Sequence, residues 1–295
     1  MDKLSVIIPS RNEKYLPNTI DDIFLKAVGD IEIIVICDGY WPDPPLKNDK
    51  RLILIHHPES KGLRPGVNAG AEIAKGKYLM KCDAHCMFEQ GFDEILKKDC
   101  EDNWLVIPRR VSLDGEKWEI ANTGRPPTDY EFISFYHRDL DAPSVRKANI
   151  WYERQKSRAD ILIDDNMSFQ GSCWLMQKKH WEKLGPLEVN GWGTFILEPE
   201  ELGNKIWLSG GRVIVNKNTK YAHWHKGKEH GRGYFIDRRG LQRGRKYNTE
   251  FWMGNKWLEN WPKQEHPFEW LIDHFWPVPT WPENWKELPN PNKYE

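Results

Sequence analysis

Continuous apolar runs in the first hundred residues constrain the fold of this chain more than any other feature. Two segments with apolar positions at helical spacing, residues 15–28 and 62–76, separate the runs, and Gly76 is placed to end the second. A strand that is apolar at every position has both faces buried, which is typical of a parallel sheet covered by helices on both sides. The sequence therefore predicts an α/β fold, with strands at residues 4–10, 31–39, 51–57 and 77–85.

The rest of the chain is less regular but continues the same alternation. Helical periodicity with a terminal Gly185 predicts a short helix at 178–185, and the acidic stretch that begins at Glu198 predicts another. Further strands are predicted at residues 103–110, 159–165 and 212–225.

Size, charge and cysteine content exclude several classes of protein. The 295 residues suffice for one large domain or two small ones. Lys and Arg number 43 against 44 Asp and Glu, so a whole-chain polyanion binder is not indicated. Five cysteines, an odd number, are expected to be reduced thiols. No signal peptide and no apolar run of ~20 residues is found, which predicts a cytoplasmic protein.

Polar residues follow three of the predicted strands. Ser10 to Glu13 follow the first strand, Asp38 ends the second, and Asp83 to His85 end the fourth. In parallel sheets covered by helices, ligands bind beyond the carboxyl ends of the strands. The three strand ends together therefore predict a binding site at this edge of the sheet.

The segment "CDAHC", residues 82–86, is the strongest single candidate for chemistry. On a strand, Asp83 and His85 would share a face, while Cys82 would point into the sheet. Structural zinc would need more Cys or His ligands at tetrahedral spacing, and no second pair is present. Asp plus His suits Mn²⁺ or Mg²⁺ with positions left for diphosphate oxygens, and a polar strand end without a role is the remaining alternative.

Four segments together resemble the GT-A fold nucleotide-sugar glycosyltransferases, which have a Rossmann-like, mostly parallel sheet with helices on both faces. The Asp-x-His-Cys form resembles most closely the polypeptide N-acetylgalactosaminyltransferases and family-2-like enzymes. The resemblance covers about residues 4 to 235. It implies a catalytic domain at 1–235, with a nucleotide-binding half at 1–100 and an acceptor half at 101–235. The four segments are residues 5–13, 32–39, 62–86 and 191–211.

The resemblance also implies roles for individual residues. The metal ligands would be Asp83, His85 and His223, holding Mn²⁺ or Mg²⁺, with His225 as the alternative third ligand. Asp38 would contact the nucleotide base. The implied donor-binding residues are Pro9, Arg11, Glu13, Asp38, Gly62, Arg64, Asp83, Gly171, Ser172 and Trp192.

Glu198 and Glu201 are the candidate catalytic residues. In the resembling fold, an acidic residue here orients the acceptor or removes its proton. Alternatively, these carboxylates form only the negative first turn of a helix that has Pro199 at its start.

The function implied is metal-dependent transfer of a sugar from a nucleotide-diphosphate sugar, UDP-sugar being favoured, to an acceptor hydroxyl. The acceptor could be a glycan, a small molecule or modified DNA. Residues 226–246 are strongly basic, which leaves open a phage-type enzyme that glycosylates a hydroxymethylated DNA base. A non-catalytic sugar-nucleotide-binding module is a further alternative.

Residues 236–295 form a basic and then Trp- and Pro-rich extension. Seven of the 16 tryptophans follow Glu250, and disordered segments are poor in aromatic residues. The prolines exclude one long helix. We therefore expect short helical and extended pieces whose indoles pack on the catalytic domain.

Overall fold

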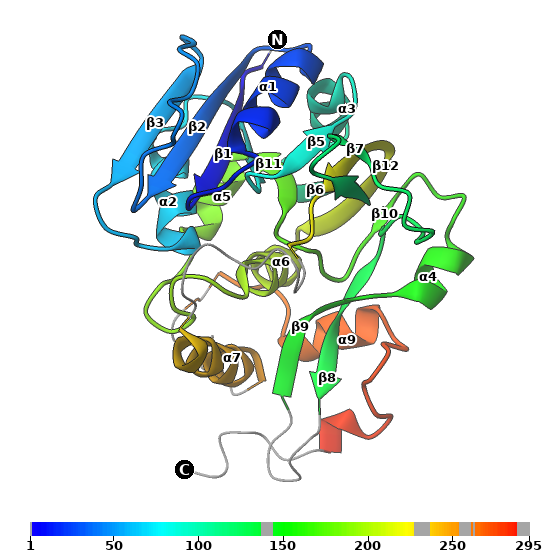
Figure 1. Cartoon of the computed structure of the whole chain (residues 1–295). Helices are drawn as coiled ribbons and strands as arrows, with labels where there is room; N and C mark the ends of the chain where they lie inside the picture. The colour runs from blue at the N-terminus through cyan, green and yellow to red at the C-terminus, as the bar shows by residue number, and fades with distance from the viewer. Residues whose placement is uncertain (1, 137–143, 227–236, 254–260, 262, 288–295) are drawn as a thin grey trace.

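The computed structural model describes the chain except for residues 1, 137–143, 227–236, 254–260, 262 and 288–295 (Figure 1). The strands are β1 (Leu4–Ser10), β2 (Ile31–Asp38), β3 (Leu52–His57), β4 (Tyr78–Cys82), β5 (Cys86–Phe88), β6 (Trp104–Asp114), β7 (Glu119–Ile120), β8 (Glu131–Tyr136), β9 (Ser144–Ile150), β10 (Ile163–Asp165), β11 (Cys173–Gln177) and β12 (Arg212–His223). The helices are α1 (Leu16–Lys26), α2 (Leu63–Ile73), α3 (Phe92–Lys98), α4 (Tyr152–Ser157), α5 (Lys178–Leu184), α6 (Glu198–Leu208), α7 (Arg238–Met253) and α9 (Phe268–His274), followed by a 3-10 turn, η1 (Trp285–Glu287).

One large, mostly parallel sheet organises the described residues. Its order is β10-β12-β6-β11-β4-β1-β2-β3, with β5 paired to β12 and β7 to β6. β1 pairs in parallel with β2 and β4, and β6 pairs in parallel with β12. β11 is antiparallel to both β4 and β6, so β6 and β12 run in the same direction as β1 and β4. This arrangement confirms the predicted α/β class.

Helices cover both faces of the sheet (Figure 1). Neighbouring residues of a strand point to opposite faces, and in β1 both faces are buried. Ile7 belongs to the core that holds side chains of α2, α5 and α6. Val6 belongs to the core that holds side chains of α1 and α3. The continuous apolar runs are thus explained by burial on two sides.

Two predicted element ends are wrong. α2 ends at Ile73, not at Gly76. Gly76 instead allows close approach to β1, since a Cβ there would lie 2.7 Å from the Ser5 nitrogen. β4 ends at Cys82, so Asp83 and His85 lie in the turn that follows the strand. Their shared direction therefore comes from that turn and not from strand alternation.

The sheet places β1 and β4 at its switch point. From β1 the chain moves outward through β2 to β3 and then returns to β4 on the other side of β1. In open α/β sheets, the crevice beyond the carboxyl ends of two such strands is the usual ligand site. The residues after Ser10 and after Cys82 lie at this crevice.

In the described parts of the C-terminal extension, α9 and η1 are short, whereas α7 is a helix of 16 residues, longer than the sequence predicts. Trp252, Trp261, Trp281 and Trp285 are buried. The indole of Trp281 donates to the carbonyl of Ile133 in β8 at 2.7 Å. The predicted domain boundary after residue 235, and most of the basic segment before it, lie outside the described residues, so that boundary stays a prediction.

No helix among the described residues is both long and apolar enough to cross a bilayer.

Candidate metal and donor site

Residues at the carboxyl ends of β1, β2, β4 and β12 line one cavity of about 470 Å³. Asp38 ends β2, Asp83 and His85 follow β4, and His223 ends β12. The convergence that the polar strand ends predicted is therefore present. Of the predicted donor-binding residues, Pro9, Arg11, Glu13, Asp38, Gly62 and Asp83 line this cavity.

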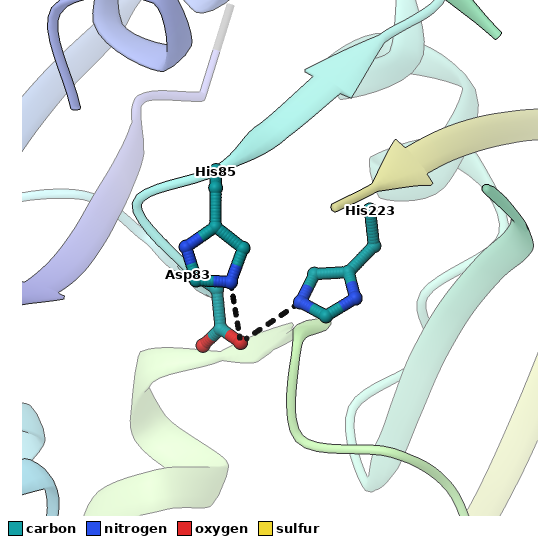
Figure 2. Close-up of side chains that lie close together, drawn as sticks. All are labelled: Asp83, His85 and His223. Carbon is teal, nitrogen blue, oxygen red and sulfur yellow. Dashed lines mark hydrogen bonds and ion pairs between the residues drawn. The ribbon is translucent and has the colours of Figure 1, made fainter. Parts of the chain in front are cut away.

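Asp83, His85 and His223 form a candidate metal centre. Each offers one ligand atom, and these atoms lie within 4.8 Å of one another. Asp83 Oδ2 is 3.2 Å from His223 Nε2 and 3.9 Å from His85 Nε2 (Figure 2). One carboxylate oxygen and two imidazole nitrogens suit Mn²⁺ better than Mg²⁺, which prefers oxygen ligands. The residues present fit a divalent ion with open coordination positions.

His223, not His225, joins this group. The His225 ring lies beside the His223 ring, with centroids 4.6 Å apart, and it also lines the cavity. β12 ends at His223, so the chain has left the strand before His225. The geometry favours His223 as the third ligand, and its role in metal binding stays a prediction.

The charge states of the three side chains also suit a cation. Burial lowers the pKa of His223 to about 3, so its ring is neutral, the form that binds metals. Burial would raise the pKa of the Asp83 carboxyl, but Lys81 and the two imidazoles outweigh that effect and hold it well below its usual range. Asp83 is therefore ionised.

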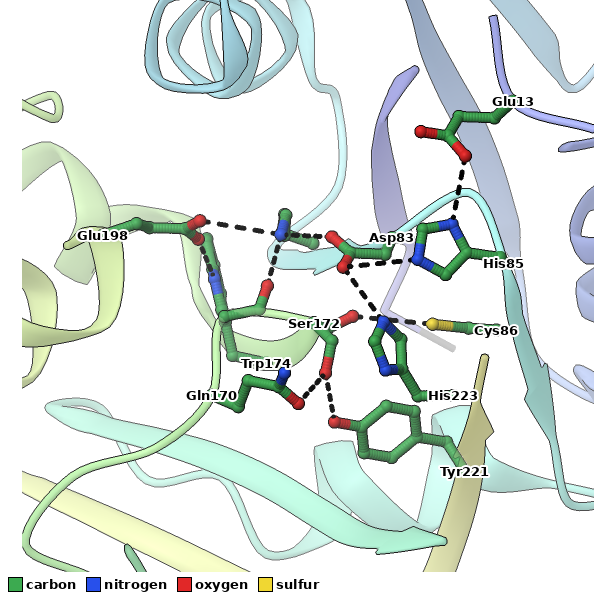
Figure 3. Close-up of polar contacts among 12 residues, drawn as sticks. Glu13, Asp83, His85, Cys86, Gln170, Ser172, Trp174, Glu198, Tyr221 and His223 are labelled. Carbon is green, nitrogen blue, oxygen red and sulfur yellow. Dashed lines mark hydrogen bonds and ion pairs between the residues drawn. The ribbon is translucent and has the colours of Figure 1, made fainter. Parts of the chain in front are cut away.

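Cys82 and Cys86 are not zinc ligands in this arrangement. Burial raises the pKa of both thiols, so they stay protonated. The Cys86 thiol lies 3.6 Å from the carbonyl oxygen of Ser172 (Figure 3). The candidate metal centre found in the described residues contains no cysteine.

Lys81 holds the other oxygen of Asp83. Its buried ammonium donates to Asp83 Oδ1 at 2.7 Å and to the carbonyl oxygen of Gly171, and lies 3.5 Å from Glu198 Oε2. Burial lowers the pKa of Lys81, but Asp83 and Glu198 outweigh that effect and raise it. Lys81 is therefore a fixed positive charge behind the metal centre.

Glu13 supports His85. Glu13 Oε2 lies 3.4 Å from His85 Nδ1, and Glu13 also pairs with Lys226. A carboxylate beside the far nitrogen of a metal-binding imidazole orients the ring and fixes its tautomer. Glu13 thus faces the cavity while contacting a predicted metal ligand.

Asp38 organises the loop between β3 and α2. Its carboxylate accepts hydrogen bonds from the backbone nitrogens of Lys61 at 2.7 Å and Gly62 at 3.0 Å, and from the Ser60 hydroxyl at 2.6 Å. Gly62 has φ +98°, and a Cβ there would lie 2.6 Å from the Thr194 Cβ, so only glycine fits. Contact of Asp38 with a nucleotide base stays a prediction.

Gly171 and Ser172 lie behind the cavity rather than beside it. The Ser172 carbonyl accepts from the Asp83 nitrogen at 2.9 Å, and the Ser172 hydroxyl contacts the Tyr221 hydroxyl at 2.6 Å. Gly171 accepts from Lys81. Neither residue lines the cavity, although Gln170 does. In this structure they contact the Asp83 backbone and Lys81, and their position beside a donor sugar stays a prediction.

The structure does not support the predicted roles of Arg64 and Glu201. Both side chains are fully buried, and they form an ion pair with each other. The Arg64 guanidinium also donates to the carbonyls of Glu188 and Ile196, and Glu201 accepts from Lys205 at 2.5 Å. Neither side chain lines the cavity.

Trp192 is a core residue. Its indole donates to Asn248 at 2.9 Å, and its ring packs against Phe251 of α7. It does not line the cavity of the metal centre, although it reaches a second cavity of about 390 Å³ beside it. Its predicted contact with the donor sugar is not supported.

Glu198 is buried behind Gly171, with 3% of its surface exposed. Its carboxylate accepts from the Trp174 indole at 2.6 Å and pairs with Lys81 (Figure 3). It does not line the cavity, so the structure does not support its predicted contact with an acceptor. The sequence analysis missed Lys81 and Trp174, although a lysine within an apolar strand, two residues before Asp83, is an unusual signal.

Comparison with known proteins identifies the family of this chain. The family model described as Glycosyl transferase family 2 matches residues 5–185, more than half of the chain. Polypeptide N-acetylgalactosaminyltransferase 6 of Bos taurus is 25% identical over 237 residues, covering 72% of this chain and 35% of that protein. Glycosyltransferase GlyA of Streptococcus pneumoniae is 25% identical over 237 residues, covering 75% of this chain and 30% of that protein. The chain thus spans about a third of the length of these relatives.

Two solved structures share the fold. GalNAc-T7 with UDP, GalNAc and Mn²⁺ superposes with a TM-score of 0.65 at 18% identity, over 93% of this chain and 56% of that one. S. aureus TarS with UDP-GlcNAc superposes with a TM-score of 0.55 at 13% identity, over 84% of this chain and 65% of that one. This chain therefore has the GT-A fold and belongs to glycosyl transferase family 2.

Proposed function

We propose that this glycosyltransferase uses a divalent ion, Mn²⁺ in preference to Mg²⁺, to transfer a sugar from a UDP-sugar to an acceptor hydroxyl. The observation that carries the proposal is the Asp83, His85 and His223 group at the switch point of the sheet. Of the two solved structures that share this fold, one is a complex with UDP and Mn²⁺ and the other is a complex with UDP-GlcNAc.

The chain's own residues would bind and orient the donor. Asp83, His85 and His223 would hold the ion, which when bound offsets the charge that develops on the leaving diphosphate. Arg11 and Lys226 line the same cavity and bring further positive charge to it. Asp38 and the loop that it orders would contact the nucleoside. Glu198 and Glu201 are not proposed as bases, because neither lines the cavity.

The test is incubation of the protein with a panel of nucleotide sugars, with and without Mn²⁺, and chromatography of the released nucleotide. Donor hydrolysis or transfer that requires Mn²⁺ and prefers UDP-sugars is the expected result. Donor binding without turnover under every condition would support a non-catalytic binding module instead. Turnover that is equal in EDTA would contradict the metal site.

An acceptor that carries phosphate groups, such as modified DNA, is the second candidate. α7 exposes Arg238, Arg239, Arg243, Arg245 and Lys246. The second cavity adjoins the first and is lined by Arg11, Lys61 and Arg243, with Asp237 as a counter-charge. Phosphate contacts make binding strongly dependent on salt. Duplex DNA should therefore bind more weakly as salt rises, and the absence of binding at low salt would remove this candidate.

A further inference from the structure

We propose that Lys81 and Glu198 are positioning residues that orient the carboxylate of Asp83 and set how tightly the metal centre holds a divalent cation. This inference rests on the proposed metal site. It assigns Glu198 an indirect role, through Lys81 and Asp83, in place of the contact with an acceptor that the sequence predicts.

The fold brings Lys81 of β4 and Glu198 of α6 together beside Trp174 of β11. Lys81 of β4 lies directly opposite Trp174 of the antiparallel strand β11. Glu198, the first residue of α6, accepts from the Trp174 indole at 2.6 Å and lies 3.5 Å from the Lys81 ammonium. Lys81 and Glu198 are 1% and 3% exposed, so water does not screen their charges effectively.

Lys81 binds one carboxylate oxygen of Asp83 and leaves the other to face the two histidines. Its ammonium occupies Oδ1 at 2.7 Å, while Oδ2 is the oxygen that faces His223 and His85 (Figure 3). Asp83 would therefore offer a single oxygen to the cation. Polar partners behind a metal ligand commonly fix its geometry in this way.

The sign of the charge effect follows from the same contacts. The Lys81 ammonium repels a cation and competes with it for Asp83. Glu198 offsets that ammonium, and the Trp174 indole keeps Glu198 in place. Removal of the Glu198 charge leaves Lys81 paired to Asp83 alone, so the site should hold a divalent cation more weakly.

The test is titration of the purified full-length protein with Mn²⁺, followed by the electron paramagnetic resonance signal of free Mn²⁺. Glu198→Gln keeps the shape of the side chain and removes its charge, and its Mn²⁺ dissociation constant should rise by about tenfold. Glu198→Asp keeps the charge, and its Mn²⁺ affinity should stay closer to that of the wild type. If Glu198 acts by packing alone, the Asp variant should be the more damaged of the two.

Glu201→Gln is the matched control, because Glu201 lies on the same helix turn with equal burial but pairs with Arg64 and Lys205. It should lower the melting temperature and leave Mn²⁺ affinity unchanged. If Glu198→Gln does not fold, Trp174→Phe removes the indole donor while keeping Glu198, and its Mn²⁺ affinity should fall by about threefold.

The outcomes separate this inference from the proposed function. Folded Glu198→Gln, or Trp174→Phe in its place, that binds Mn²⁺ as tightly as the wild type would overturn the positioning role and leave the metal site intact. A wild-type protein that does not bind Mn²⁺ in the presence of UDP would overturn the metal site itself, and the positioning role with it.

Discussion

Two buried ion-pair clusters begin on the first turn of α6, three residues apart, yet they face different surroundings. Glu198 pairs with Lys81, whose ammonium holds Asp83 at the wall of the open cavity. Glu201 pairs with Arg64 and Lys205 in a cluster that is closed on all sides. The contacts of Glu198 lead through Lys81 to the cavity, whereas the contacts of Glu201 stay in the protein interior. The two neighbouring carboxylates therefore differ in their surroundings.

The two clusters should respond differently to substitution. A buried ion pair contributes little net stability compared with apolar groups, but removal of one partner leaves an uncompensated buried charge. In the closed cluster, removal of one partner should lower only the free energy of unfolding. In the open cluster, the charges act on a proposed metal ligand, so substitution there should alter cation and donor binding.

The largest expected effect is that of Asp83→Asn in the open cluster. It removes the negative charge that the proposed cation requires, so turnover should fall by more than about 100-fold. Folding should persist, because the amide is isosteric and Asp83 is partly exposed. Circular dichroism and a donor-hydrolysis assay check the two halves of this prediction. Normal turnover in this variant would remove Asp83 from the metal site.

Arg64→Met tests the closed cluster. Glu201 would be left buried without its guanidinium partner, so the free energy of unfolding should fall by about 3–5 kcal/mol in urea titration. Arg212→Met is the control, since its pair with Asp165 is partly exposed, with a cost of about 0–1 kcal/mol. A loss of donor binding in folded Arg64→Met, without a loss of stability, would place Arg64 in the donor site after all.

Trp281→Ala tests whether the C-terminal extension, like the closed cluster, stabilises the fold. The indole is buried and hydrogen-bonded to β8, so its removal should cost about 3–5 kcal/mol of unfolding free energy. Trp276, which is 40% exposed, is the matched control and should lose much less when changed to Ala. Equal stability of both variants and the wild type would show that the extension is an independent appendage.

The smallest expected effect is on donor affinity in Asp38→Ala. Asp38 orders the loop that carries Gly62 to the cavity, and loss of charged hydrogen bonds should weaken donor binding by about 1–3 kcal/mol. Calorimetry with the preferred nucleotide measures the change. An unchanged affinity would show that Asp38 supports only the fold, as the closed cluster does.

The fold was predictable because burial on both faces leaves a direct pattern in the sequence. The runs that form β1 and β2 are apolar at nearly every position, and both strands are buried throughout. The antiparallel pair β8–β9 lacks that pattern, because it forms a separate two-stranded sheet that packs partly on the C-terminal extension. Its pairing depends on contacts that no local periodicity records.

The grouping of Asp83, His85 and His223 was predictable from strand ends and from a family resemblance, whereas the partners of the two glutamates were not. Asp83 and His85 stand two residues apart, and His223 ends a strand that follows two glycines. The contact of Glu198 with Lys81 joins residues 117 positions apart, and the pairing of Glu201 with Arg64 joins residues 137 positions apart. Such partners are fixed by side-chain contacts of the first turn of α6 with β4, β11 and α2, which the acidic stretch alone does not specify.

Calorimetric titration of UDP into the protein, with and without Mn²⁺, tests the central claim most directly. Wild type and His225→Ala should bind UDP tightly only when Mn²⁺ is present, whereas Asp83→Asn and His223→Ala should lose that dependence together with most of the affinity. UDP binding that is equally tight without Mn²⁺, or that is unaffected by Asp83→Asn, would contradict the account. Loss of binding in His225→Ala with a silent His223→Ala would reassign the third ligand.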